Sequence, residues 1–132
     1  MADSAILTTG QVRSFRDLIL WQEAMTLAVD VHKVARLLPS DERFELGRDL
    51  RRSSTSIPSN VAEGFNRRSR KVYRVHVAIA LGSTGELETQ LEVARRLSLI
   101  ESKVITDLLA RCQRVGRLGQ GLWRSLKPPR SK

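Results

Sequence analysis

The chain has 132 residues and carries 23 Lys and Arg against 14 Asp and Glu, a net charge of +9. This length suits one domain that can bury enough surface to fold alone. Only 5% of the residues are aromatic and four are proline, which favours helices. One cysteine excludes an internal disulfide, and two histidines leave few ligands for a metal.

Nothing in the sequence predicts export or a membrane span. The first 12 residues lack a basic start and a sustained apolar run, so they do not resemble a signal peptide. No stretch reaches the roughly 18 uncharged apolar residues that cross a bilayer. We therefore expect an all-α, cytoplasmic protein with no membrane partner.

The first helix is expected to begin near Phe15, after a flexible tail over residues 1–13 and at the start of a bundle domain over 14–127. Apolar side chains then recur at steps of three and four, the spacing of one helix face. Pro39 ends this helix, because the residue before a proline is pushed out of the α region. The predicted stripe consists of Leu18, Trp21, Met25, Ala28, His32 and Ala35.

A second helix is expected from Ser40 and Asp41, whose side chains can cap it. Residues 53–60 then allow two interpretations. Read locally, they form a loop followed by a short new helix. Read with their surroundings, they belong to one long helix kinked at Pro58, where an amide donor is missing. We favour the kinked helix, with residues 64–68 as its exit.

The third helix follows Ser69, which can cap it. Gly82 and Gly85 lie inside it although each costs about 1 kcal/mol relative to alanine. We therefore expect them to permit a close backbone approach. The predicted face of this helix consists of Val72, His76, Ile79, Ser83, Leu87, Gln90 and Ala94.

The fourth helix is expected to start near Ser102 and to stop at Pro128, before a basic tail over 128–132. Four such helices joined by short connections predict an antiparallel up-down-up-down four-helix bundle. The apolar stripe of the fourth helix consists of Ile105, Leu108, Cys112, Val115, Leu122 and Leu126.

The positive charge is concentrated in two segments. Residues 43–74 carry nine basic and three acidic side chains, and residues 111–132 carry seven basic and none acidic. The rest of the chain is net negative. This asymmetry predicts a basic face that attracts a polyanion, of which nucleic acid is the commonest. The alternative is that the arginines only solvate exposed helix faces.

The first basic segment supplies the main candidates for phosphate contact. Guanidinium groups are planar and permanently charged, and they can donate two parallel hydrogen bonds to a phosphate. Free amides after Ser69 could add to such a site. For Arg51 and Arg52 the alternative is pairing with Glu63 or Glu86 across helices or subunits. The candidates are Arg51, Arg52, Arg67, Arg68, Arg70, Lys71 and Arg74.

The second basic segment is expected to occupy one side of the fourth helix. It is either a solvated face or an extension of a nonspecific RNA footprint. The basic residues of the two segments do not alternate regularly with aromatic ones, so we expect recognition of backbone and shape and not base stacking. The candidates here are Arg111, Arg114, Arg117 and Arg124. The aromatic residues expected to anchor the core or an interface are Phe15, Trp21, Phe44, Phe65 and Trp123.

Three blocks of sequence carry a resemblance to a known family. They are FRDLILWQ at 15–22, SIPSNVAEG at 56–64 and ALGSTGELETQL at 80–91. In this order and spacing they resemble the bacterial four-helix bundle family encoded in intervening sequences of large-subunit ribosomal RNA genes. The chain departs from that pattern at residues 53–55, Ser-Ser-Thr, where members often have two alanines, and at Asn66, where a glycine is common.

The resemblance implies a bundle that assembles into a closed ring, typically of five copies, with cytosolic location and no catalysis. The family is similar in architecture to the accessory variability protein of diversity-generating retroelements. That protein is a basic pentameric bundle that engages a reverse transcriptase and structured RNA. The resemblance therefore provides a precedent for RNA binding.

These observations together predict a non-enzymatic homo-oligomer that binds or scaffolds structured RNA. The alternative is a protein-interaction adaptor for a nucleic-acid enzyme such as a reverse transcriptase. We expect no catalytic residue, no cofactor and no metal site. Glu63, Glu86 and Glu88 have no nucleophile or histidine at a known catalytic spacing.

Overall fold

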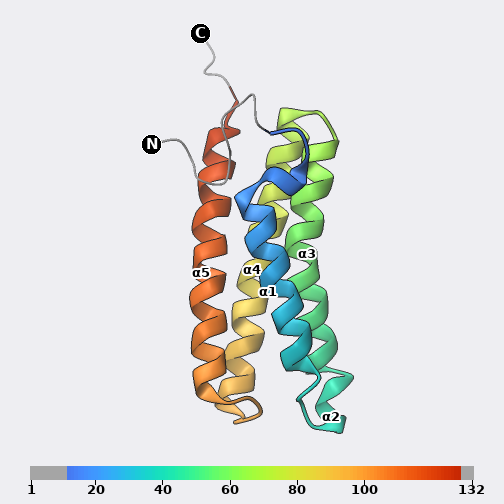
Figure 1. Ribbon diagram of the computed structural model, residues 1–132, viewed down its shortest axis with the longest axis vertical. Helices are drawn as coiled ribbons and strands as arrows, with labels where there is room; N and C mark the ends of the chain where they lie inside the picture. The colour runs from blue at the N-terminus through green and yellow to red at the C-terminus, as the bar shows by residue number, and fades with distance from the viewer. Residues whose placement is uncertain (1–11, 129–132) are drawn as a thin grey trace.

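The computed structural model describes residues 12–128, and these residues form helices and no strand. Four of the helices are long and pack into one bundle (Figure 1). The predicted all-α fold is confirmed. The predicted tails lie almost wholly outside the described residues. The elements are the 3₁₀ turn η2 (Phe15–Asp17), α1 (Ile19–Ala35), α2 (Ser40–Arg43), α3 (Leu46–Asn66), α4 (Arg70–Arg96) and α5 (Ser102–Ser125).

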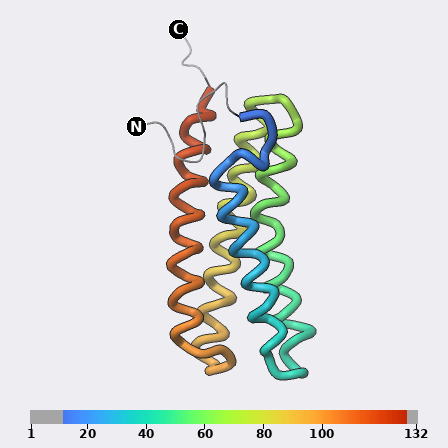
Figure 2. Tube along the Cα trace, in the orientation of Figure 1, coloured from blue at the N-terminus to red at the C-terminus, as the bar shows by residue number. Residues whose placement is uncertain are grey.

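The four long helices run antiparallel in chain order, as Figure 2 shows. Helix α1 packs on α3, α3 on α4, and α4 on α5, which returns to α1 and closes the bundle. The α3–α4 connection, the start of α1 and the end of α5 therefore lie together, and we call this the junction end (Figure 1). Within the described range, no helix is long and apolar enough to cross a membrane.

Helix α3 continues without a break through Pro58, so the single-helix interpretation is confirmed and the local one, with a loop at 53–60, is wrong. Pro58 is buried and removes the donor that would reach four residues back. A nearby hydroxyl bonds locally: Ser54 Oγ donates to the Arg51 carbonyl at 3.1 Å. Although residues 53–60 have the composition of a loop, packing of α3 against α1 and α4 keeps them helical.

Two helix starts differ from the prediction. Phe15–Asp17 is a 3₁₀ turn closed by a capping box from Ser14, and α1 begins only after the extended residue Leu18. The second predicted helix is interrupted after Arg43, and α3 begins at Leu46. The side chain of Phe44, at this break, is 73% exposed and belongs to no core.

The predicted stripes of α1 and α4 are only partly buried. Leu18, Ala28 and Ala35 of the first stripe, and Ser83, Leu87 and Ala94 of the second, are buried as predicted. In α1 the fully buried positions include Leu20, Leu27 and Val31, while Trp21 and Met25 are only half-buried. Ile79 of α4 is 46% exposed. Both helices carry a second apolar face, so spacing predicts the helix without deciding which face meets the core. On α5, which has one apolar face, the predicted stripe is wholly buried.

The close backbone approach occurs at Gly64 and not at Gly82 or Gly85. A Cβ atom at Gly64 would lie 2.8 Å from the Cβ of His76, on the facing helix α4. At Gly82 and Gly85 an added Cβ would meet nothing within 4 Å. These two glycines therefore face outward, and the described chain itself makes no close backbone approach at either of them.

Candidate nucleic-acid interface

The α3–α4 connection brings two arginines to the junction end. Arg67 is the C-cap residue that follows α3, and its side chain reaches Glu63 at 3.4 Å. Arg68 follows with φ of 56°, a left-handed conformation that glycine usually occupies after a helix. Both side chains are exposed. Ser69 caps α4 as predicted, because its hydroxyl accepts from the Val72 amide at 3.2 Å.

Arg70 and Arg74 connect the start of α4 to the end of α5. The Arg70 guanidinium donates to the Ser125 carbonyl. Arg74 Nε donates to the Trp123 carbonyl at 3.1 Å, and its guanidinium carbon lies 3.6 Å from the centroid of the Trp123 ring. Cations at a helix C-terminus donate hydrogen bonds to the free carbonyls there and interact favourably with the negative end of the helix dipole. These two arginines therefore stabilise the fold as well as carrying charge.

An aromatic ring thus lies against the first basic segment, which the sequence analysis did not predict. Trp123 comes from the other end of the chain, 49 residues after Arg74. No local spacing could show this contact. One signal was available in the sequence. Trp123 lies near the end of the fourth predicted helix, and in an antiparallel bundle that end lies beside the start of the third helix.

Beside this stack is a pocket of about 870 Å³ between α4 and α5. Its floor contains Val75 and Ile79, which are 54% and 46% exposed. Arg70, Lys71 and Arg74 line it, and no acidic side chain does. Lys71 is exposed and has no ion-pair partner among residues 12–128. The pocket therefore combines an apolar floor with a cationic wall.

Arg51 and Arg52 do not join this cluster. Arg51 lies 16 positions before Arg67 along α3, which at about 1.5 Å per residue separates them by roughly 24 Å. Arg52 pairs with Asp49 at 3.6 Å. The alternative, pairing with Glu63 or Glu86, is not made within the described chain. Glu63 contacts Arg67 and His76 instead.

The second basic segment is divided between two faces of α5. Arg111 pairs with Asp30 of α1 at 2.9 Å, and Arg114 pairs with Glu23 of α1 at 3.0 Å. Arg117 and Arg124 are exposed and line a groove with α4. The prediction of one basic side is wrong, because each step of three residues turns the helix by about 300° and the deviation accumulates.

Polar side chains of α3 and α4 form a row of hydrogen bonds between the two helices. Ser53 Oγ donates to Gln90 Oε1 at 2.6 Å, and the hydroxyls of Ser56 and Ser83 are 2.8 Å apart. His76 Nδ1 lies 3.0 Å from Asn60 Oδ1. These contacts fix how α3 and α4 are aligned along their length. Across residues 12–128 there is no group of three His, Cys, Asp or Glu that could hold a metal.

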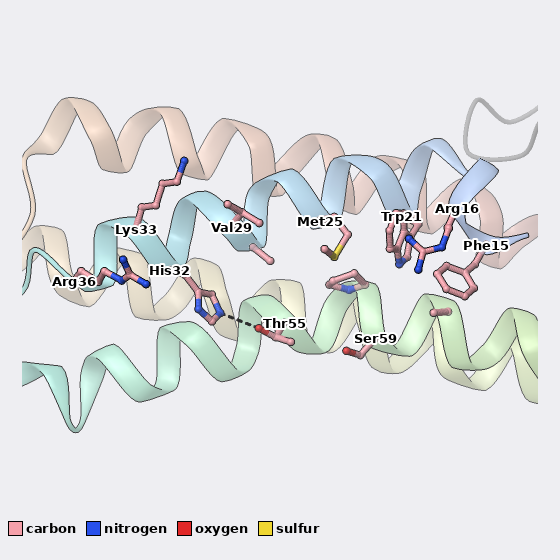
Figure 3. A pocket seen from close by; sticks show the side chains of 13 residues that line it. Phe15, Arg16, Trp21, Met25, Val29, His32, Lys33, Arg36, Thr55 and Ser59 are labelled. Atoms are coloured by element: carbon pink, nitrogen blue, oxygen red, sulfur yellow. Dashed lines mark hydrogen bonds between the residues drawn. The ribbon is translucent and has the colours of Figure 1, made fainter.

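A second concave surface lies between α1 and α3, as Figure 3 shows. This groove of about 530 Å³ contains Trp21, Met25 and Val29, which largely belong to the stripe that the sequence assigned to the core. His32 Nε2 is 2.9 Å from Thr55 Oγ1 across it (Figure 3). The basic side chains along the groove are Arg16, Lys33 and Arg36.

The fold and these surfaces define an antiparallel four-helix bundle with a basic junction end. The family described as 23S rRNA-intervening sequence protein matches residues 16–121, and the chain belongs to that family. A crystal structure of a protein of unknown function from the S23 ribosomal protein family of Bacteroides thetaiotaomicron superposes with a TM-score of 0.75 at 21% identity. The alignment covers 80% of this chain and 96% of that one, which shows a shared fold. A comparison with curated proteins finds no match.

Proposed function

We propose that this protein is a non-enzymatic, cytoplasmic homo-oligomer that binds or scaffolds structured RNA through its junction end. The observation that carries the proposal is the group of exposed cations at that end. Arg68 and Lys71 have no acidic partner among the described residues, and Arg67 is only weakly paired at 3.4 Å. Exposed pairs of this kind hold a side chain weakly, so a phosphate can displace them.

Recognition of backbone and shape suits this surface. The cations lie on one helix connection and the first turn of α4, where free amides add positive potential. A duplex or a folded RNA presents phosphates at such spacings without exposing its bases. The family's link to ribosomal RNA genes is the reason to test RNA before other polyanions.

Self-association is part of the proposal, and the surface that we assign to it is the part of the outer face of α4 from Gly82 to Val93, beyond the first three turns of the helix. Gly82 and Gly85 lie there in open space, and Val93 is 43% exposed. Each glycine weakens the helix by about 1 kcal/mol without an internal packing reason. A second copy of the chain approaching closely at these glycines supplies that reason. The ring of five copies comes from the family resemblance.

The test is binding of the purified, nuclease-treated protein to a labelled structured RNA across a salt series. Wild-type protein is expected to bind with an affinity that falls steeply with salt, by a log–log slope of about 0.7–0.9 per phosphate contacted. The variant R67E/R68E/K71E is expected to lose binding, because repulsion replaces three contacts. Circular dichroism checks that it remains helical.

A matched control reverses three exposed cations at the opposite end of the bundle. R36E/R48E/K103E changes the net charge by the same amount and is expected to retain most of the affinity. Equal losses in both variants would mean that only net charge matters. No binding by the wild type at low salt would overturn the RNA function.

The groove between α1 and α3 favours a second candidate function. Its apolar lining and basic side chains suit an acidic amphipathic helix of a protein partner. In that case the protein is an adaptor for a nucleic-acid enzyme such as a reverse transcriptase. Binding of such an enzyme that survives nuclease treatment and is lost in Met25→Asp, together with no RNA affinity, would favour this function.

A further inference from the structure

The pocket between the start of α4 and the end of α5 has no role in backbone recognition. Its floor, formed by Val75, Ala78 and Ile79, is apolar, and two of these side chains are about half exposed. An apolar surface open to water is costly unless something covers it. At about 870 Å³ the pocket is within the usual range for binding one small group.

The basic and aromatic side chains that line the pocket suit a planar group that is linked to an anion. Arg70, Lys71 and Arg74 line it and no carboxylate opposes them. The Arg74 guanidinium lies over the Trp123 ring, 3.6 Å from its centroid, and also donates to the Trp123 carbonyl. RNA-binding proteins stack unpaired bases on aromatic rings and on guanidinium planes of this kind.

From this geometry we propose that the pocket takes one unpaired nucleotide of a structured RNA. Its base lies on Val75 and Ile79 beside the Arg74–Trp123 stack, and its phosphate contacts Lys71. The pocket is about one helical turn from the Arg67 and Arg68 connection, so one RNA can occupy both surfaces. This inference rests on the proposed RNA function and assigns it a preference for RNA with a bulged or unpaired residue.

The experiment compares three hairpin RNAs of one stem sequence. The first is fully paired, the second has one bulged nucleotide, and the third has an abasic residue at the bulge. Wild-type protein is expected to bind the bulged RNA roughly tenfold more tightly than the abasic one, the order that stacking of one base contributes. Both bulged backbones carry the same phosphates, so charge cannot produce the difference.

A matched pair of variants places the preference in the pocket. Ile79→Ser removes part of the floor without changing charge and is expected to abolish the tenfold preference while abasic binding stays unchanged. Val29→Ser in the α1–α3 groove is the control, because Val29 is 47% exposed, close to the 46% of Ile79. It is expected to retain the preference.

Fluorescence gives a second readout. The chain has two tryptophans, so Trp21→Phe leaves Trp123 as the only one. Its emission is expected to change with the bulged RNA and not with the abasic RNA. Equal binding of all three RNAs would overturn the nucleotide pocket and leave the proposed RNA function intact. Binding of none would overturn both.

Discussion

At the scale of single residues, Arg68 is expected to affect stability and RNA binding in opposite directions. A left-handed residue with a side chain is strained, and glycine relieves the strain. We expect Arg68→Gly to raise the free energy of unfolding by about 0.5–1 kcal/mol and to weaken RNA binding severalfold. Chemical denaturation and RNA titration measure the two effects.

Ser98, in the α4–α5 connection, provides the control for this prediction. Its φ is 55°, so it has the same strain without the charge. Ser98→Gly is expected to stabilise the fold to a similar degree and to leave RNA affinity unchanged. If Arg68→Gly instead destabilised the fold, the left-handed conformation would not be a source of strain.

The thiol of Cys112 provides a second prediction at this scale. Burial, with a smaller contribution from the charge of Glu88, raises the pKa of Cys112 to about 12. The reactive thiolate is therefore scarce in the folded protein below that pH. We expect negligible alkylation by iodoacetamide at pH 8, and rapid alkylation once denaturant unfolds the chain. Fast reaction of the native protein would contradict the burial of this side chain.

At the scale of elements, the sequence predicted the long helices well and their contacts less well. Ser69 as a cap and the stripe of α5 follow from local chemistry, and both are confirmed. The turn at Phe15–Asp17 and the break at Phe44 depend on how the chain enters the bundle. The contact of Arg74 with Trp123 depends on two helices meeting, which no local pattern contains.

The spacing between α3 and α4 near the junction end depends on one glycine. A methyl group at Gly64 would meet the Cβ of His76 at 2.8 Å and the Tyr73 ring at 3.0 Å. We expect Gly64→Ala to lower the free energy of unfolding by about 1–3 kcal/mol, since overpacking outweighs the gain in helix propensity. Gly116→Ala is the control, because an added Cβ there meets nothing within 4 Å. It is expected to stabilise the chain, and thermal unfolding distinguishes the two variants.

At the scale of the whole molecule, the outward glycines of α4 predict assembly. Gly82→Lys places a long charged side chain where we expect a second copy to approach, and it clashes with nothing in the described chain. The variant is expected to remain helical and to sediment as a smaller species than the wild type. Analytical ultracentrifugation of both proteins at equal concentration measures this. Identical sedimentation would remove α4 as the interface.

The candidate site was only partly predictable from the sequence. The charge asymmetry correctly placed exposed cations at 67–71. The charge asymmetry did not predict that Arg111 and Arg114 are paired. Their acidic partners lie on α1, more than 80 residues earlier in the chain. Counting charge along the chain cannot show which cations are neutralised across helices. The pocket beside Trp123 was missed for the same reason.

The bonds from Arg70 and Arg74 to the last turn of α5 have a consequence for the end of the chain. A phosphate that draws either guanidinium away leaves carbonyls of that turn without a donor. The last helical turn then frays more readily, and its amides exchange hydrogen faster. We therefore expect RNA bound at the junction end to speed hydrogen exchange at the C-terminal turn.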